Sequence, residues 1–165
     1  MSSWGVLAMW NDGWFKVQSV EYGGQWLAVF GVNVKVNFNC VVVGVYAGRS
    51  AAESRILLEE LILIKNAFGL PIFVAGDFNE TLFSNKRSSG YLNITSSTAF
   101  WTFISDCNLL EYPLFGYRYS LFRGRLMSHI DRAFAAWECN LQFPDLSLTI
   151  LQRGLSDHCL MILEA

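Results

Sequence analysis

An acid and an amide stand two residues apart in Gly76-Asp77-Phe78-Asn79, directly after the apolar run Ile72–Ala75. If that run is a buried strand, the tetrapeptide lies at its carboxyl end, where ligands bind in α/β sheets. The Asp77 carboxylate can then orient water or accept its proton, and the Asn79 amide can donate to a phosphate oxygen. An Asx-type turn without a chemical role suits the same residues, so the tetrapeptide alone supports both interpretations.

A second polar pair, Asp157 and His158, precedes the final apolar segment. Neighbouring side chains on a strand project to opposite sides, so both reach one site only if the strand has ended or is bulged there. His158 can bind a phosphoryl oxygen as a cation or act in acid–base catalysis, and Asp157 can bind a hard cation such as Mg²⁺. The alternative is a polar loop before an edge strand.

A third segment, Ser128-His129-Ile130-Asp131-Arg132, alternates as a strand does. Ile130 then faces the core and Asp131 the opposite side. A buried Asp131 can hydrogen-bond one nitrogen of His158, which fixes the imidazole tautomer and raises its pKa. The alternative is a surface pair between Asp131 and Arg132, and we interpret His129 as a structural or exposed histidine rather than a ligand.

The elements that must position these residues begin with strands. We predict them over Trp4–Trp10, Trp14–Glu21, Gln25–Val34 and Asn39–Ala47. The continuous apolar run Cys40–Val43 indicates a central strand. Ser50 and Glu53 then predict a capping box for a helix that extends to Phe68, with Gly69 and Pro71 ending it.

The order strand, amphipathic helix, strand at residues 39–75 indicates an α/β layered fold. A second helix is predicted over Ser97–Cys107. Further strands are predicted near Leu109–Tyr112, Arg118–Phe122, Ser128–Ala135, Leu146–Leu151 and Cys159–Leu163. The chain has 165 residues and shows no repeat or linker, so we expect a single domain over residues 1–165.

Composition limits the class of protein. Hydrophobic residues make up 53% of the chain, but no uninterrupted apolar run reaches the ~20 residues that a membrane span needs, so we expect a large core and no membrane partner. The four cysteines form no C-x-x-C pair, and the N-terminus lacks the regions of a secretory signal. We therefore expect an intracellular protein with free thiols, and a nuclear location is compatible with this.

The formal net charge of −2 argues against a protein that coats nucleic acid through bulk charge, but it leaves room for a local basic patch. Basic residues gather between the two acidic motifs, at Lys86, Arg87, Arg118, Arg123, Arg125 and Arg132. As phosphate contacts we select Lys86, Arg87, Arg125 and Arg132. The alternative is ordinary solvated loop charge.

Together and in this order, Tyr46, Gly-Asp-Phe-Asn, Ile-Asp-Arg and Ser-Asp-His resemble the endonuclease/exonuclease/phosphatase superfamily. The fold implied is the DNase I-like four-layer α/β sandwich, with two mixed sheets flanked by helices. More narrowly, Val45–Ala47, Ser128–Arg132 and Leu155–Cys159 are similar to segments of the endonuclease domains of plant LINE-type retroelements. The resemblance extends from about Trp4 to the end of the chain.

The resemblance implies hydrolysis of a phosphodiester that depends on Mg²⁺ or Mn²⁺, with DNA as the expected partner. Asp77 would activate the attacking water, and Asn79 and Tyr46 would position the phosphate. His158 would stabilise charge on the phosphoryl group, and Asp131 would orient His158.

The metal site is where the sequence departs from the family. Asp157 would help to hold the ion, but the family's first strands, one of which ends in a metal-binding Glu, are not found, and Glu21 lacks that context. A single carboxylate is a poor Mg²⁺ site. We therefore expect a domain that lacks the first strands, has an open sheet edge through which copies can associate, and is impaired in catalysis.

Three functions remain open at this point. The first is a nucleic-acid endonuclease with impaired activity. The second is a phosphatase of the same superfamily that acts on a small phosphoester. The third is a non-catalytic remnant or binding module that has kept the fold.

Overall fold

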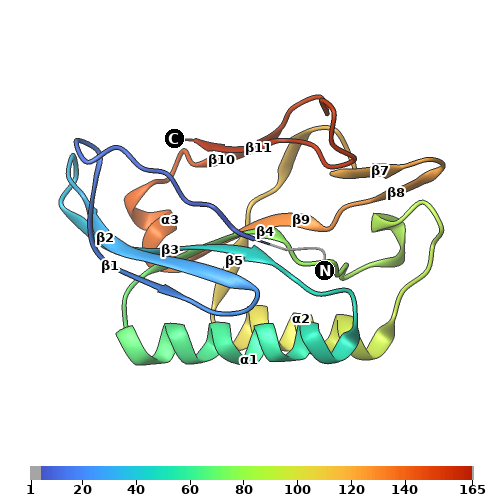
Figure 1. The fold of residues 1–165 in the computed structure, drawn as a ribbon, viewed down its shortest axis with the longest axis horizontal. Helices are drawn as coiled ribbons and strands as arrows, with labels where there is room; N and C mark the ends of the chain where they lie inside the picture. Colours follow the sequence, from blue (N-terminus) through green and yellow to red (C-terminus); the bar gives the residue numbers. More distant parts are fainter. Residues whose placement is uncertain (1–4, 165) are drawn as a thin grey trace.

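A six-stranded mixed sheet forms the centre of the computed structural model, which describes residues 5–164 (Figure 1). The strands lie in the order β1-β2-β3-β4-β9-β5, and only β3 and β4 run parallel. Their bounds are Phe15–Tyr22, Trp26–Asn33, Phe38–Tyr46, Ile72–Asp77, Asp131–Ala136 and Leu109–Glu111 in that order. The prediction that residues 40–43 belong to a central strand is confirmed, because β3 lies inside the sheet.

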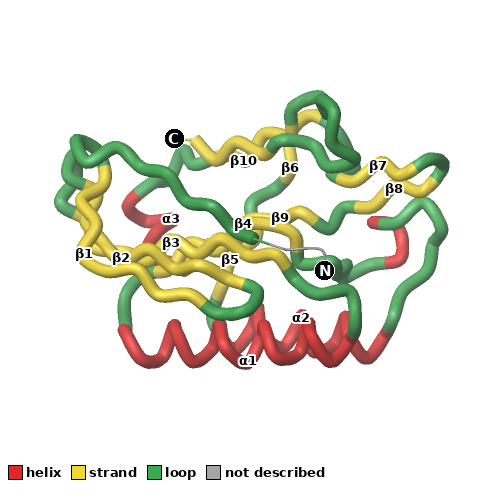
Figure 2. The backbone as a smooth tube through the Cα atoms, viewed as in Figure 1, coloured by secondary structure: helices red, strands yellow, loops and turns green. Residues whose placement is uncertain are grey.

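A smaller mixed sheet lies over one side of the first, as the strands of Figure 2 show. It has the order β11-β10-β6, and a separate hairpin is formed by β7 and β8. The bounds are β6 Leu114–Gly116, β7 Leu121–Arg123, β8 Leu126–Ser128, β10 Ser147–Ile150 and β11 Met161–Glu164. Within the described residues β11 is the outermost strand of its sheet, and association of copies through such an edge stays a prediction.

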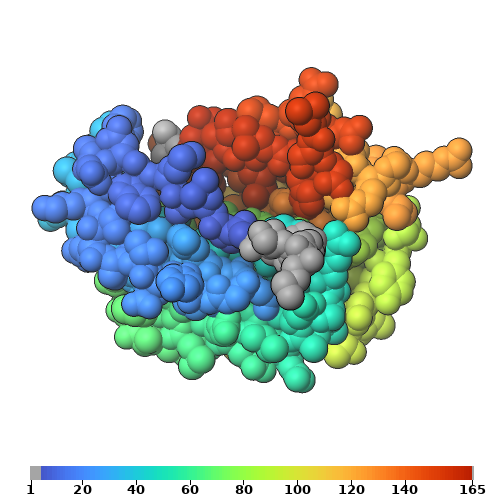
Figure 3. Space-filling model, in the orientation of Figure 1, coloured from blue at the N-terminus to red at the C-terminus, as the bar shows by residue number. Residues whose placement is uncertain are grey.

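Helices α1 (Ala51–Phe68) and α2 (Ile94–Asp106) cover the other face of the large sheet (Figure 1). Figure 3 shows α1 along the lower surface and the C-terminal segment along the upper one, with the first strands at the left between them. A short helix α3 (Trp137–Gln142) follows β9, and a 3₁₀ turn spans Ser84–Lys86. No helix in the described part of the chain is long and apolar enough to cross a membrane.

The start and end of α1 follow from local chemistry, as predicted. The Ser50 hydroxyl accepts from the Glu53 amide at 3.2 Å, and the Glu53 carboxylate accepts from the Ser50 amide at 3.0 Å. Gly69 ends the helix in the left-handed conformation, with φ +58°. Leu57 and Leu61 are buried on its inner face, so the predicted amphipathic pattern is confirmed.

Aromatic rings join α2 to the large sheet beneath the acidic motif. The rings of Phe78 and Phe100 lie 5.1 Å apart, and both contact Phe134 of β9 edge to face. This confirms that Phe78 points into the core while its neighbours Asp77 and Asn79 do not. Such aromatic contacts add to the free energy gained from area burial.

Several predicted boundaries are wrong. The strand predicted over residues 4–10 is not formed from residue 5 onward; residue 4 lies outside the described part. Leu7 and Met9 there stay exposed, so the segment gains no burial that would favour a strand. Helix α2 begins earlier than predicted because the Asn93 side chain caps it by accepting from the Ser96 amide. The strand predicted over residues 128–135 is divided between β8 and β9, and α3 was not predicted.

Gly76 gives a testable prediction. Its φ of +137° suits glycine alone, and a Cβ there would lie 2.1 Å from the Val45 carbonyl oxygen. We expect Gly76→Ala to lower the free energy of unfolding by at least about 2 kcal/mol, measured by urea denaturation. Gly154→Ala is the control, because that position has open space and no positive φ. Equal stability of the two variants would contradict the expectation.

Candidate active site

Three strand ends place Tyr46, Asp77 and Asp131 in one row across the large sheet. Tyr46 of β3 is the register partner of Asp77 of β4, and Asp77 is the partner of Asp131 of β9. Side chains directly opposite each other on neighbouring strands project to the same face. The three side chains therefore share the face opposite α2, since Phe134 of β9 meets α2 on the other side. The sequence analysis selected these three residues from three separate segments of the chain.

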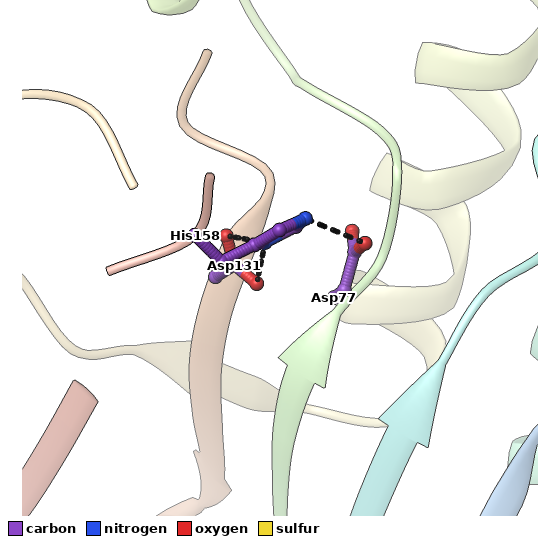
Figure 4. Close-up of side chains that lie close together, drawn as sticks. All are labelled: Asp77, Asp131 and His158. Atoms are coloured by element: carbon purple, nitrogen blue, oxygen red, sulfur yellow. Dashed lines mark hydrogen bonds and ion pairs between the residues drawn. The ribbon is translucent and has the colours of Figure 1, made fainter. Parts of the chain in front are cut away.

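His158 completes the cluster from the loop before β11 (Figure 4). Its Nδ1 lies 2.9 Å and 3.0 Å from the two carboxylate oxygens of Asp131, as predicted. Its Nε2 lies 3.8 Å from an Asp77 oxygen. The imidazole thus stands between the two aspartates, with Nδ1 held by Asp131 and Nε2 directed to Asp77.

The electrostatics of this cluster follow from burial and like charge. Asp77 is 6% exposed, and its pKa is raised to about 6 by burial and then by the charge of Asp131. The amide of Asn79 opposes this rise by donating to the carboxylate. The hydrogen bond to Asp131 raises the pKa of His158, although burial acts in the opposite direction. At mildly acidic pH the cluster therefore favours a proton on the imidazole.

Asn79 forms the Asx-type turn that the sequence offered as one interpretation of the tetrapeptide, and its contact with a phosphate stays a prediction. Its amide donates to Asp77 Oδ1 at 2.8 Å, which is an Asx-type turn, and its φ is +51°. Its side-chain amide also donates to the Ala47 carbonyl at 2.6 Å and so ties together the ends of β3 and β4. Tyr46, the residue before Ala47, has a raised pKa because of partial burial and the nearby Asp77 charge.

Asp157 stands outside this cluster. One of its carboxylate oxygens accepts from Arg123 Nε at 2.8 Å and from Arg123 Nη2 at 2.5 Å, and this interaction lowers the pKa of Asp157. The predicted metal ligand is therefore paired with an arginine of β7. The set of ligand atoms that lie together comes instead from Asp77, Asp131 and His158, all within 4.8 Å of one another.

Of the four basic residues selected from the sequence, three are at least partly exposed and one is buried. Lys86 lies 3.2 Å from His129 Nδ1, Arg87 donates to the Asn79 carbonyl at 2.9 Å, and Arg125 is exposed at the β7–β8 turn. Arg132 is 2% exposed and pairs with Glu111, so a phosphate cannot reach it. The selection of Arg132 is therefore wrong, and so is the alternative of a surface pair with Asp131.

His129 behaves as the sequence analysis expects of a structural histidine. It is buried, and burial followed by the charge of Lys86 lowers its pKa to about 4. Its imidazole is therefore neutral near neutral pH, unlike that of a phosphate-binding cation.

The sequence motifs did not indicate Arg49 or the role of Arg123. Arg49 follows the end of β3, and its charge acts to lower the pKa of Asp77. Together with Arg87 and Arg123 it lines a cleft of about 400 Å³ next to Asn79. The position of Arg49, three residues beyond the end of the central strand β3, was the available signal. Arg123 was counted among the basic residues of its segment, but nothing local indicated its pairing with Asp157, which depends on the position of the β7–β8 hairpin.

The comparisons with known proteins agree with this geometry. The model of the endonuclease/exonuclease/phosphatase family matches residues 2–158, so the chain belongs to that family. No curated protein matches the sequence.

Solved structures show the same fold. The endonuclease domain of TRAS1, a telomere-specific non-LTR retrotransposon, has a TM-score of 0.67 at 14% identity, over 85% of this chain and 61% of that one. The AP endonuclease LMAP from Leishmania major has a TM-score of 0.61 at 15% identity, over 85% and 54%. A mannosyl-6-phosphatase from Bacteroides thetaiotaomicron has a TM-score of 0.52 at 17% identity, over 84% and 55%.

The chain spans between about half and three-fifths of these proteins. The likeness confirms the predicted DNase I-like fold class, a mixed α/β architecture with two mixed sheets and helices. Enzymes of this family typically depend on a metal ion. Asp77, Asp131 and His158 offer two carboxylates and an imidazole, a donor set that suits Mn²⁺ as well as the harder Mg²⁺.

The buried charge of Asp77 predicts a pH-dependent stability. Because its folded pKa of about 6 exceeds the ordinary value of 3.8, ionisation of Asp77 destabilises the fold progressively as pH rises from about 4 to above 6. Asp77→Asn keeps an acceptor for the Asn79 amide but carries no charge. We expect it to raise the free energy of unfolding by up to about 3 kcal/mol at pH 8 and much less at pH 4.

Urea denaturation at the two pH values measures this difference. Asp145→Asn, at an exposed position, is the control and should change stability equally little at both. If Asp77→Asn raises the free energy of unfolding no more at pH 8 than at pH 4, the charge of Asp77 does not destabilise the fold.

Proposed function

We propose that this chain hydrolyses phosphodiester bonds in nucleic acid with the help of a divalent metal ion. The observation that carries the proposal is the imidazole of His158 held between Asp131 and Asp77. Membership of the family supports the hydrolytic class, and two of the similar structures are endonucleases. The arginine-lined cleft beside Asn79 supports a substrate with several phosphates rather than one.

In this proposal each side chain has a role that its surroundings favour. Asp77 is ionised above about pH 6 and accepts a proton from the attacking water. His158, oriented through Nδ1 by Asp131, presents Nε2–H to the phosphoryl oxygen on which negative charge develops. Tyr46, next to Asp77 in the row, helps to position the phosphate. When bound, a divalent ion would be held by carboxylate oxygens of Asp77 and Asp131 and would supply further positive charge to that oxygen.

We also propose that catalysis by this chain is weak. Asp157, the ligand expected from the resemblance, is paired with Arg123, which leaves two aspartates and one histidine for an ion. One of those aspartates already holds the imidazole. Mg²⁺ retains its water ligands and requires well-placed carboxylates, so we expect Mn²⁺ to support the reaction better.

Cleavage of supercoiled plasmid tests the proposal directly. We expect nicking in the presence of Mn²⁺ that falls by roughly a hundredfold or more in Asp77→Ala and in His158→Ala. Asp145→Ala is the matched control at an exposed acid and should cut as the unchanged protein does. Nicking that persists in both site variants would overturn the assignment of the site. Release of phosphate from a small phosphoester without nicking would favour the phosphatase alternative.

The dependence of cleavage on pH follows from the same two groups. We expect the rate to rise roughly tenfold per pH unit up to about pH 6, as Asp77 loses its proton. At higher pH the rate falls once His158 loses its proton, and the raised pKa of His158 moves that decline above its ordinary position. Rates measured from pH 4.5 to 9 check both limbs. A flat profile below pH 7 would exclude Asp77 as the base.

A further inference from the structure

Ser120 is completely buried, at 0% exposure, although it lies in a loop just before the short strand β7. Its hydroxyl accepts two backbone hydrogen bonds, from the Asp131 amide at 3.0 Å and from the Ile130 amide at 3.2 Å. Its own amide donates to the Ser128 carbonyl at 3.0 Å. The hydroxyl therefore holds the start of β9, where the Asp131 side chain leaves the backbone.

The same residue also holds the loop that carries His158. The Ser120 carbonyl accepts from the Cys159 amide at 2.7 Å, and two residues further on the Phe122 amide donates to the Asp157 carbonyl at 2.8 Å. These bonds fix the residues on either side of His158, and Leu121 forms a β-bridge with His158 itself. The backbone from Ser120 to Phe122 is thus paired with the histidine loop.

We infer that Ser120 is a positioning residue for the Asp131–His158 pair. It bonds to the backbone of Asp131 through its side chain and to the neighbour of His158 through its main chain, so it fixes the two partners relative to each other. The imidazole bond of 2.9 Å needs both backbones in place, because the two residues lie 27 positions apart in the sequence. The catalytic part of this inference rests on the proposed function, but the structural part does not.

The chemistry of the hydroxyl explains why serine suits the position. One oxygen with two lone pairs serves two adjacent amides in a space from which water is excluded. Alanine would leave both buried amides without this acceptor, which the backbone can relieve only by moving. Cysteine is slightly larger than serine and leaves no cavity, but its sulfur is a weak acceptor. Threonine would retain the hydroxyl.

Imidazole ¹⁵N NMR tests the inference, because the chain contains only two histidines. At alkaline pH, where the imidazoles are neutral, we expect His158 to carry its proton on Nδ1 in the unchanged protein. In Ser120→Ala and Ser120→Cys we expect a mixture of the two tautomers, as the bond to Asp131 weakens, and Ser120→Thr should restore the Nδ1 form. His129 is an internal reference, since its ring contacts Lys86.

Ser97→Ala is the matched control, because Ser97 is also buried but its hydroxyl donates to the Leu82 carbonyl, away from the cluster. It should leave the His158 signals unchanged. If Ser120→Ala does not fold, Ser120→Cys still gives the answer, since it fills nearly the same volume. Folded Ser120→Cys with an unaltered His158 tautomer would overturn the inference, and so would an equal change in Ser97→Ala.

Plasmid cleavage separates this inference from the proposed function. If the unchanged protein nicks plasmid, we expect Ser120→Cys to lower kcat by roughly tenfold to a hundredfold with little change in KM, because the general geometry for binding persists. If the unchanged protein cuts nothing, the proposed function fails, while the NMR comparison still judges the role of Ser120. Wild-type kcat in folded Ser120→Cys would overturn the catalytic part.

Discussion

The hydrogen bond between His158 Nδ1 and Asp131 is the interaction on which the site depends. Asp131 begins β9 of the large sheet, and His158 precedes β11 of the small sheet. The bond therefore forms only when the two sheets lie over each other. It connects the layers where Ser120 also holds the backbone of Asp131 in β9 and of Cys159 in the loop before β11. The site is therefore assembled only when the two sheets pack against each other.

Like charge is the constraint that this bond relieves. Asp77 and Asp131 are both buried and are direct partners on neighbouring strands, so two carboxylates face one small space. The imidazole of His158 lies between the two carboxylates, and the pKa of Asp77 is raised. A protonated His158 therefore stabilises the fold, and in the proposed function the same cation meets the phosphate. The stability of the site and its chemistry have the same electrostatic origin.

Local signals were sufficient for part of this structure. The capping box of α1 and the turn at Gly69 involve residues close together in sequence, and each was predicted correctly. The contact between Asp131 and His158 was also predicted, from the alternation around Ile130 and from the resemblance to the family, against the alternative of a surface pair between Asp131 and Arg132. Arg132 was assigned wrongly because its burial depends on elements distant in sequence: its guanidinium lies over the ring of Phe100 of α2 and pairs with Glu111 of β5. The pairing of Asp157 with Arg123 depends likewise on where the hairpin lies.

The adjacent residues Asp157 and His158 bind different partners on two sides of the loop. Since β11 begins only at Met161, the two side chains leave a loop and meet different partners, Arg123 and Asp131. An ion that took Nε2 of His158 as a ligand would require the neutral imidazole. Binding of the ion through that nitrogen and protonation of His158 are therefore alternative ways to neutralise Asp77 and Asp131. An ion that leaves the imidazole cationic would instead be held by carboxylate oxygens and water.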